Sequence, residues 1–99
     1  MATSDARHDF DHAVAAVVQD IPAGVVVSYG WVASEAGFPG LARAVGRLLA
    51  SSPAPLPWWR VTRADGVLAP PVARRQAEML RGEGVVVHGR RVTPRPLRP

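Results

Sequence analysis

The chain contains no cysteine and no lysine. Without cysteine, these 99 residues hold no disulfide, no thiolate nucleophile and no cysteine-bound zinc. They also lack any run of about 18 apolar residues, so no membrane span and no membrane partner are expected. The acidic start, MATSDARHDFDH, has none of the apolar core of a secretory signal. These absences lead us to expect a cytoplasmic protein.

Positive charge is concentrated in one part of the chain. Residues 1–42 carry one arginine against five carboxylates, whereas residues 43–99 carry eleven arginines against three carboxylates. A basic region in a small domain favours a polyanionic partner such as nucleic acid. The alternative is codon bias, which explains the choice of arginine over lysine but explains the asymmetry less easily.

The length and apolar content suit one small domain. Of the 99 residues, 47% are apolar, which is enough to fold but leaves little room for a second core. We expect a single domain over residues 1–93 and a flexible, basic, proline-rich tail over 94–99. The three histidines do not have metal-site spacing, so no metal or other cofactor is expected, and we expect a monomer.

The first elements follow from apolar spacing and from helix-ending residues. Residues 8–20 are predicted to form a helix, with Asp5 or Asp9 at its start and with Pro22 and Gly24 after its end. The three valines that come next suit a short strand or an extended segment.

Residues 28–50 have the pattern of a helix-turn-helix. Ser28 is a suitable N-cap for a helix over 29–36, and the sequence GFPG at 37–40 ends that helix. A second helix is expected over 41–50. Two short helices joined by a tight, glycine-containing turn are typical of this motif.

The second of these helices combines charge with small side chains. Arg43 and Arg47 lie four positions apart and therefore share one face. Ala42 and Gly46 would allow a close approach to a partner's backbone. Helix pairs with two arginines are common, so this pattern alone does not identify the partner.

The remaining elements are short. Residues 58–62 are predicted to form a strand, and an Asp65 turn leads toward residues 67–68 as in a hairpin. A last helix is expected over 71–81, followed by a small hairpin over 85–92. The predicted fold class is therefore mostly helical with small β hairpins.

Three segments, in order, resemble the DNA-binding and active-site domain of the O6-alkylguanine-DNA alkyltransferases. Residues 21–30 (IPAGVVVSYG) are similar to that family's IPxGxVxTYG stretch, and residues 37–46 (GFPGLARAVG) to its GxPxAARAVG helix. Residues 57–61 (PWWRV) align with its catalytic PCHRV box, and residues 80–85 (LRGEGV) are a weaker match to its LLxxEG ending. The resemblance implies a winged helix-turn-helix DNA-binding domain.

The aligned box departs from the enzymes at its reactive position. Trp58 replaces the cysteine and Trp59 replaces the histidine. Tryptophan at the first position is typical of the alkyltransferase-like proteins, which keep the binding fold but do not transfer alkyl groups. Indole nitrogen is a donor without basicity, so Trp58 cannot replace a thiolate nucleophile. We therefore expect no catalytic residue and no enzyme activity.

This resemblance implies a damage sensor that binds the minor groove of double-stranded DNA. Such a protein would turn O6-alkylguanine out of the helix into a pocket and mark it for nucleotide excision repair proteins. Two alternatives remain. One is a general winged-helix DNA-binding protein or regulator without lesion specificity, and the weaker one is a catalyst of another class.

The resemblance also implies roles for residues on the DNA-binding side. Tyr29 would lie near the phosphate of the target nucleotide, although a partly buried aromatic is the structural alternative. Arg43 would stack in the gap left by the extruded base, and Arg47 would contact a phosphate. The predicted DNA-binding set is completed by three small residues, namely Ser28, Ala42 and Gly46.

A second predicted set lines the lesion pocket. Trp58 would offer its aromatic face to the base, while Trp59 suits the core. The other predicted pocket residues are Tyr29, Ser52, Val67, Leu68 and Arg74, with Arg75 as the alternative to Arg74. Ser52 stands where the enzymes have asparagine, and prolines occupy the pocket-rim loop at 70–71. Arg60 and Glu83 are expected to be structural, with Glu83 pairing with a nearby arginine.

Overall fold

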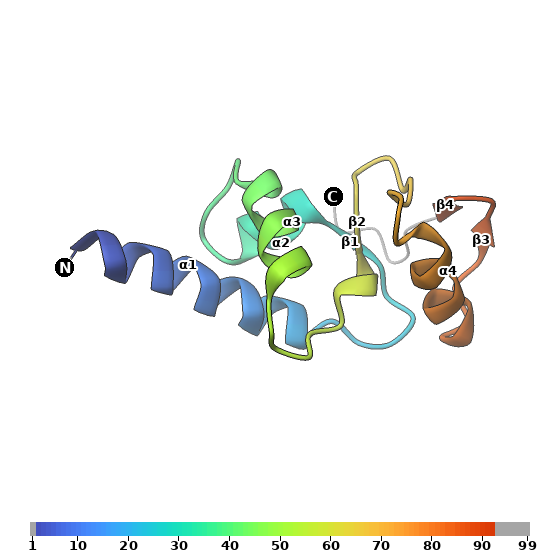
Figure 1. Cartoon of the computed structure of the whole chain (residues 1–99), viewed down its shortest axis with the longest axis horizontal. Coiled ribbons are helices and arrows are strands. Elements are labelled where there is room, and N and C mark those ends of the chain that lie inside the picture. The colour runs from blue at the N-terminus through green and yellow to red at the C-terminus, as the bar shows by residue number, and fades with distance from the viewer. Residues whose placement is uncertain (1, 93–99) are drawn as a thin grey trace.

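The computed structural model describes residues 2–92, and the side chains from residue 8 onward. Helices dominate these residues, and four two-residue strands form two small sheets (Figure 1). The elements in chain order are α1 (Ala2–Gln19), β1 (Val27–Ser28), α2 (Tyr29–Glu35), α3 (Ala42–Ser51), the 3-10 turn η1 (Trp58–Arg60), β2 (Val61–Thr62), α4 (Ala73–Gly82), β3 (Val87–His88) and β4 (Arg91–Val92). The predicted fold class is confirmed, while the predicted tail over 94–99 lies outside the described residues.

The helix-turn-helix is formed by α2 and α3. Ser28 caps α2 as predicted, because its Oγ accepts a hydrogen bond from the backbone N–H of Trp31 at 3.0 Å. Gly37 and Gly40 in the connecting turn have φ angles of 91° and 88°, which side-chain-bearing residues rarely adopt. The glycines of the GFPG sequence therefore determine how sharply α3 turns away from α2.

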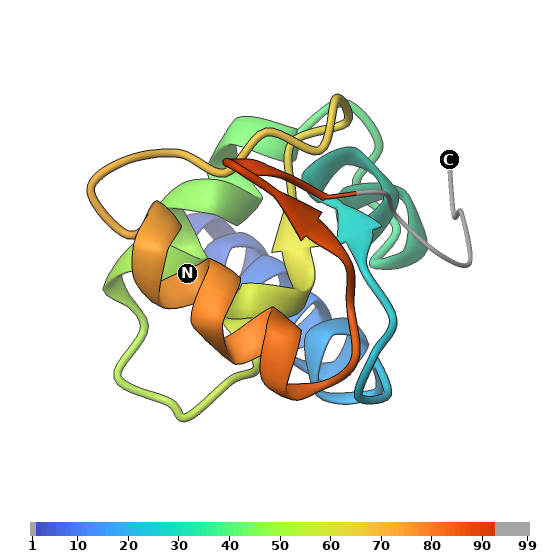
Figure 2. The ribbon, with the colours of Figure 1, turned by 90° about the vertical axis from the view of Figure 1, so that its right-hand side faces the viewer.

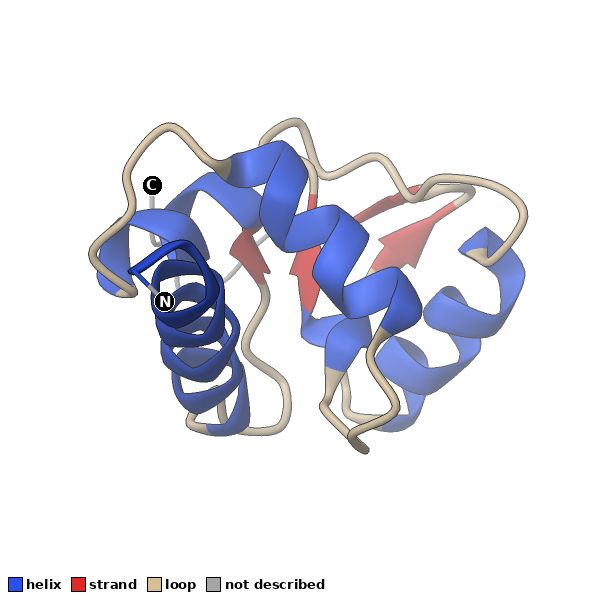
Figure 3. Ribbon diagram, turned by 60° about the vertical axis from the view of Figure 1, so that its left-hand side comes forward, coloured by secondary structure: helices blue, strands red, loops and turns tan. Residues whose placement is uncertain are grey.

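Two apolar clusters lie on opposite sides of the paired strands β1 and β2, which run parallel with Val27 opposite Val61. One cluster joins α1, α2 and α3, and the other joins α4 to the β3–β4 hairpin (Figures 2 and 3). Val26 belongs to the second cluster and Val27 to the first. Adjacent residues of an extended segment point to opposite faces, so this short run of valines serves both cores.

Three sequence-based expectations about the elements are wrong. The first helix begins at Ala2 instead of residue 8, so Asp5 and Asp9 both lie within the helix and neither stands at its start. Residues 58–60 form a 3-10 turn, in which the N–H of Arg60 donates to the carbonyl of Pro57 at 3.2 Å. Val67 forms a bridge with Arg91 of β4 and makes no hairpin with the preceding strand. At residues 58–60 and at Val67, tertiary contacts decide the backbone conformation. Pairing between strands this short stabilises a strand too little to outweigh those contacts.

The hairpin predicted over 85–92 is confirmed in its position. β3 and β4 pair antiparallel, with Val87 opposite Val92. Among residues 2–92, no helix combines the length and the apolar character needed to cross a membrane.

Candidate nucleic-acid interface and base pocket

A cavity of about 290 Å³ opens between the helix-turn-helix and the start of α4. Its volume lies near the lower end of the range found for sites that enclose small molecules. The cavity is lined by Tyr29, Gly46, Leu49, Ala50, Trp58, Val72 and Arg75. Tyr29 and Trp58, both predicted for the lesion pocket, are thus brought together from elements far apart in the sequence. Its side chains suit an aromatic ligand, because two rings and three aliphatic groups face one space.

Trp58 lies on the 3-10 turn and is half-buried. Its ring is edge-on to that of Trp59, with the two planes at 86° and the centroids 6.1 Å apart. The guanidinium carbon of Arg75 lies 6.0 Å from the centroid of Trp58, at the outer limit of a cation–π contact. Trp58 therefore combines an aromatic surface with a nearby positive charge.

Tyr29 is the first residue of α2, and its ring lies against the backbone of α3. A Cβ atom added to Gly46 would lie 3.9 Å from Cε1 of Tyr29, so glycine leaves room for the ring at this crossing. Burial raises the pKa of the Tyr29 phenol above its ordinary value. At neutral pH the group is therefore a protonated O–H, which can donate a hydrogen bond to an anion but is a poor nucleophile.

α3 presents the basic surface that the sequence predicts. Arg43 and Arg47 are exposed, while Ala42 and Gly46 are half-buried next to them. Val45 points the other way and is fully buried in the first cluster. The helix thus has one side in the core and an arginine-bearing side that also reaches the cavity through Gly46.

Three predicted pocket residues on the loops lie outside the cavity lining. Ser52 uses its Oγ to accept from the N–H of Ala54 at 3.1 Å. Leu68 is only 1% exposed, and its N–H donates to the carbonyl of Arg90 at 2.6 Å. The N–H of Val67 donates to Oδ1 of Asp65 at 3.0 Å. The N–H groups of Val67 and Leu68 are therefore already hydrogen-bonded, one within the Asp65 turn and the other to Arg90 beside β4.

Arg74 also points away from the cavity, which is lined instead by its neighbour Arg75. The Arg74 side chain is 94% exposed and lies 3.8 Å from Glu78 on the outer face of α4. Successive helical residues are rotated by about 100°, so the two arginines face different sides of α4. Of the two candidates that the sequence offers, the geometry selects Arg75.

Sequence reasoning did not identify Leu49, Ala50 and Val72 as cavity residues. Leu49 and Ala50 follow Gly46 by three and four positions, so helical spacing offered a signal for them. Val72 precedes α4 and is 44% exposed, and nothing in its local sequence indicates contact with Trp58.

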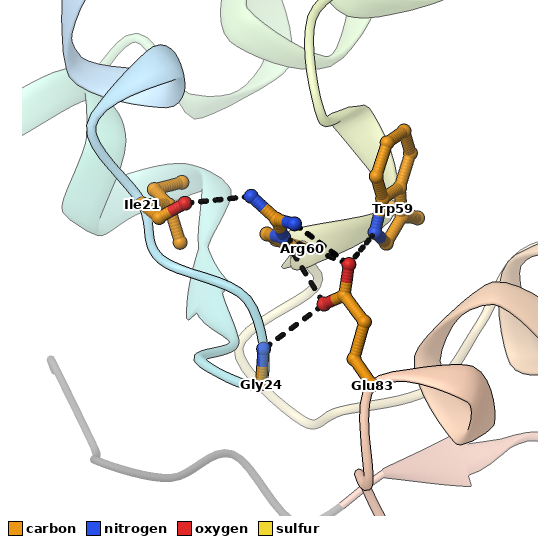
Figure 4. Close-up of polar contacts among 5 residues, drawn as sticks. All are labelled: Ile21, Gly24, Trp59, Arg60 and Glu83. Carbon is orange, nitrogen blue, oxygen red and sulfur yellow. Dashed lines mark hydrogen bonds and ion pairs between the residues drawn. The ribbon is translucent and has the colours of Figure 1, made fainter.

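A polar network holds the other tryptophan in place (Figure 4). Nε1 of Trp59 donates to Oε2 of Glu83 at 2.8 Å, and Arg60 donates to the same carboxylate from Nε and, at 2.7 Å, from Nη2. The N–H of Gly24 donates to Oε1 of Glu83, and Nη1 of Arg60 donates to the carbonyl of Ile21. The expected pairing of Glu83 with an arginine is confirmed, and the network also ties η1 to the loop after α1.

These contacts account for the acidity of Glu83. Hydrogen bonds from Arg60, opposed by burial and assisted by the N–H groups of Gly24 and Trp59, lower the pKa of Glu83 to about 2. An indole N–H donates a hydrogen bond but cannot pass a proton onward. Trp59 therefore retains a contact with Glu83 without supporting proton transfer through it.

Within the described residues, no group of three or more histidine, aspartate or glutamate side chains is placed to hold a metal ion. The cavity lining likewise contains no thiol and no histidine. Its chemistry is that of an aromatic binding site beside an arginine-bearing helix.

Comparisons with known proteins agree with this geometry. Residues 9–85 match the family model described as 6-O-methylguanine DNA methyltransferase, DNA binding domain. A DNA base-flipping protein of Vibrio parahaemolyticus is 41% identical over 76 residues, which cover 73% of this chain and 76% of that protein. A protein of the same name from Escherichia coli is 43% identical over 84 residues, covering 81% of this chain and 65% of the relative. The chain thus spans slightly less than two thirds of the E. coli relative.

Solved structures show the same arrangement. S. pombe Atl1, in complex with damaged DNA containing O6-carboxymethylguanine, superposes with a TM-score of 0.75 at 31% identity, over 82% of this chain and 81% of that one. The O6-methylguanine methyltransferase of Mycobacterium tuberculosis superposes with a TM-score of 0.68 at 37% identity, over 76% of this chain and 48% of that one. The match to that methyltransferase therefore covers about half of its length.

Proposed function

The chain belongs to the family of the 6-O-methylguanine DNA methyltransferase DNA-binding domain, and on that premise we propose that it recognises alkylated guanine in duplex DNA without repairing it. α3 would enter the minor groove, and the O6-alkylguanine would turn out of the helix into the Trp58 cavity. One observation carries this proposal. The cavity walled by Trp58 and Tyr29 opens directly beside the helix that exposes Arg43.

Base extrusion needs favourable contacts both in the Trp58 cavity and at the gap left in the duplex. Unstacking a base costs roughly a few kcal/mol, and stacking on an aromatic side chain returns roughly 1–3 kcal/mol. Trp58 supplies that stacking surface in the cavity. Arg43 is exposed on α3 and has a planar guanidinium that fills the gap in the duplex. The phenol O–H of Tyr29, protonated at neutral pH, donates to a phosphate of the turned-out nucleotide.

The lesion stays chemically intact because the site lacks a nucleophile. Alkyl transfer by the enzymes of this family requires a thiolate, and these residues contain no cysteine. The Tyr29 phenol, with its raised pKa, does not replace it. The protein therefore marks the damage, and removal of the lesion falls to other proteins, for which we propose the nucleotide excision repair system.

Paired duplexes with and without a single O6-methylguanine test the proposal. We expect tighter binding to the methylated duplex, and mass spectrometry of the recovered DNA should show that the methyl group is retained. Equal affinity for the two duplexes would contradict lesion recognition and leave a general DNA-binding protein. Loss of the methyl group would contradict the non-enzymatic function.

Arg43→Ala tests the same proposal from the side of the duplex. It should weaken binding by about tenfold or more, because a good arginine contact to a base is worth roughly 1–3 kcal/mol. Arg63→Ala is a matched control, since Arg63 is exposed, lies outside α3 and pairs with Asp65. Equal effects of the two substitutions would rule out an intercalating role for Arg43.

A further inference from the structure

A second hollow, of about 540 Å³, lies on the outer side of α4, between that helix and the turn that joins β3 to β4. Figure 2 faces this part of the molecule, with α4 and the hairpin beside each other in the foreground. Its lining consists of Pro70, Pro71, Ala73, Arg74, Ala77, Glu78, Arg81, Gly89 and Arg90. We call this hollow the arginine groove.

The charge of the arginine groove is positive. Three arginines line it against one carboxylate, that of Glu78. Glu78 approaches Arg74 only to 3.8 Å, and both side chains are largely exposed, so this pair contributes little and leaves Arg74 available. Arg81 donates from Nη2 to the carbonyl of Val87 at 3.1 Å, which fixes its guanidinium against the hairpin.

The spacing of the arginines suits a phosphate backbone. Arg74 and Arg81 are seven positions apart on α4, which is two turns and about 10 Å along the helix axis. That distance corresponds to about three base-pair steps of B-form DNA. The planar guanidinium fork also matches the geometry of phosphate oxygens. The two alanines in the groove are buried, and its exposed apolar residues are Pro70 and Pro71, so its three arginines are the feature that points to a phosphate-bearing partner.

Consecutive residues at the start of α4 line the Trp58 cavity and the arginine groove. Val72 and Arg75 line the cavity, whereas Ala73 and Arg74 line the groove, so the start of α4 separates the two spaces. The two spaces open on different sides of α4, so a DNA strand whose base enters the cavity reaches the groove by passing around the start of that helix.

We propose that the arginine groove binds the phosphates of DNA flanking the α3 contact. The DNA-binding surface would then extend from α3 to α4 and the β3–β4 hairpin. This proposal depends on one part of the proposed function, namely that α3 binds duplex DNA. It adds a second, sequence-independent contact that fixes the direction of the DNA leaving the pocket and contributes equally with and without a lesion.

The test uses the whole chain and two unmodified duplexes. One duplex ends a few base pairs from the α3 contact, and the other is long enough to reach the groove. The double variant Arg74→Gln/Arg90→Gln should bind the long duplex several-fold more weakly and the short one as before. The slope of log affinity against log salt concentration on the long duplex should shrink by about 2, since each lost phosphate contact removes about 0.9.

A matched control is Arg63→Gln/Arg91→Gln, which removes the same net charge near the groove. Both of its arginines are exposed and contact Asp65, and neither lines the groove. Equal losses in the two double variants would overturn the proposal, because net charge alone would then explain binding. Melting temperatures close to that of the unmodified protein establish that both variants are folded.

Glu78→Gln provides a change in the opposite direction. Removal of the carboxylate from the groove should tighten binding to the long duplex and leave the short duplex unaffected. The ratio of affinities for methylated and unmodified duplexes should not change in any groove variant, so failure of the groove and failure of lesion recognition are distinguishable. Unchanged long-duplex binding in both Arg74→Gln/Arg90→Gln and Glu78→Gln would overturn the proposal and turn attention to an acidic protein segment.

Discussion

Trp58 and Trp59 are neighbours on one 3-10 turn, yet their environments differ. Trp58 faces a cavity, with Arg75 as its nearest cation at 6.0 Å. Trp59 donates a hydrogen bond to Glu83, stacks under Arg60 at 5.3 Å and packs against the second apolar cluster. Trp58 thus lines a binding cavity, whereas Trp59 stabilises the fold.

The difference arises from the contacts available on each side of the turn. On the Trp59 side, the Glu83 carboxylate accepts hydrogen bonds from three residues, and Trp59 packs against the second apolar cluster. On the Trp58 side, Gly46 and Ala50 of α3 present no large side chains, and the space stays open. We call the Trp59 side, which Glu83 holds, the closed side, and the Trp58 side, which borders the cavity, the open side. The closed side keeps the turn in position for the open side. Substitutions on the two sides should therefore affect stability and binding differently.

Glu83→Ala should have the largest effect, because it removes the centre of the closed side. It leaves Arg60 and the indole N–H of Trp59 without their partner, and we expect the free energy of unfolding to fall by about 3 kcal/mol. Chemical denaturation measures this change. Glu78→Ala removes an exposed carboxylate and should change stability by less than about 0.5 kcal/mol. Similar losses in both variants would mean that the network does not stabilise the fold.

Acid should weaken the closed side in the unmodified protein. The pKa of Glu83 is about 2 in the folded state against an ordinary value of 4.5, so its stabilisation is present above pH 4.5 and is lost as the pH falls toward 2. We expect a loss of about 2 kcal/mol across this window. Denaturation at several pH values checks the result. Glu83→Gln removes this titrating group, and an equally steep decline in that variant would assign the acid sensitivity to other groups.

Trp58→Ala should affect binding far more than stability. Because stacking on an aromatic side chain is worth roughly 1–3 kcal/mol, affinity for an O6-methylguanine duplex should fall by about tenfold, and affinity for the unmodified duplex should fall less. Trp59→Phe is the matched control. It keeps an aromatic ring and loses the bond to Glu83, so it should lower stability by about 1.5 kcal/mol and leave lesion preference unchanged. The reverse pattern would exchange the roles of the two tryptophans.

Arg75→Gln should have the smallest effect, on the open side. At 6.0 Å from Trp58 the guanidinium contributes about 0.5–1 kcal/mol, so the preference for alkylated over unmodified duplex should fall a few-fold at most. Arg74→Gln should leave that preference intact, because Arg74 points to the outer face of α4. A larger effect from Arg74 on the ratio of the two affinities would contradict the assignment of Arg75 to the cavity.

Local rules predicted much of the fold. The Ser28 cap and the GFPG turn were found at their expected positions because caps and turns depend on a few neighbouring residues. The β3–β4 hairpin was also expected. The 3-10 turn at Trp58 was not expected, because aromatic residues favour strands, and the bond from Trp59 of this turn to Glu83 is a tertiary contact that local propensity does not include.

The candidate site divides in the same way. The sequence by itself determined the chemistry, since a chain without cysteine and with tryptophan at the reactive position offers an aromatic surface and no thiolate. It also indicated Tyr29 and Arg43 from one continuous motif. Only the tertiary structure decided that Arg75 and not Arg74 meets Trp58, that Leu68 is buried, and that Trp59 is held by Glu83. Those facts depend on how α4 packs against η1, and residue types alone do not specify that packing.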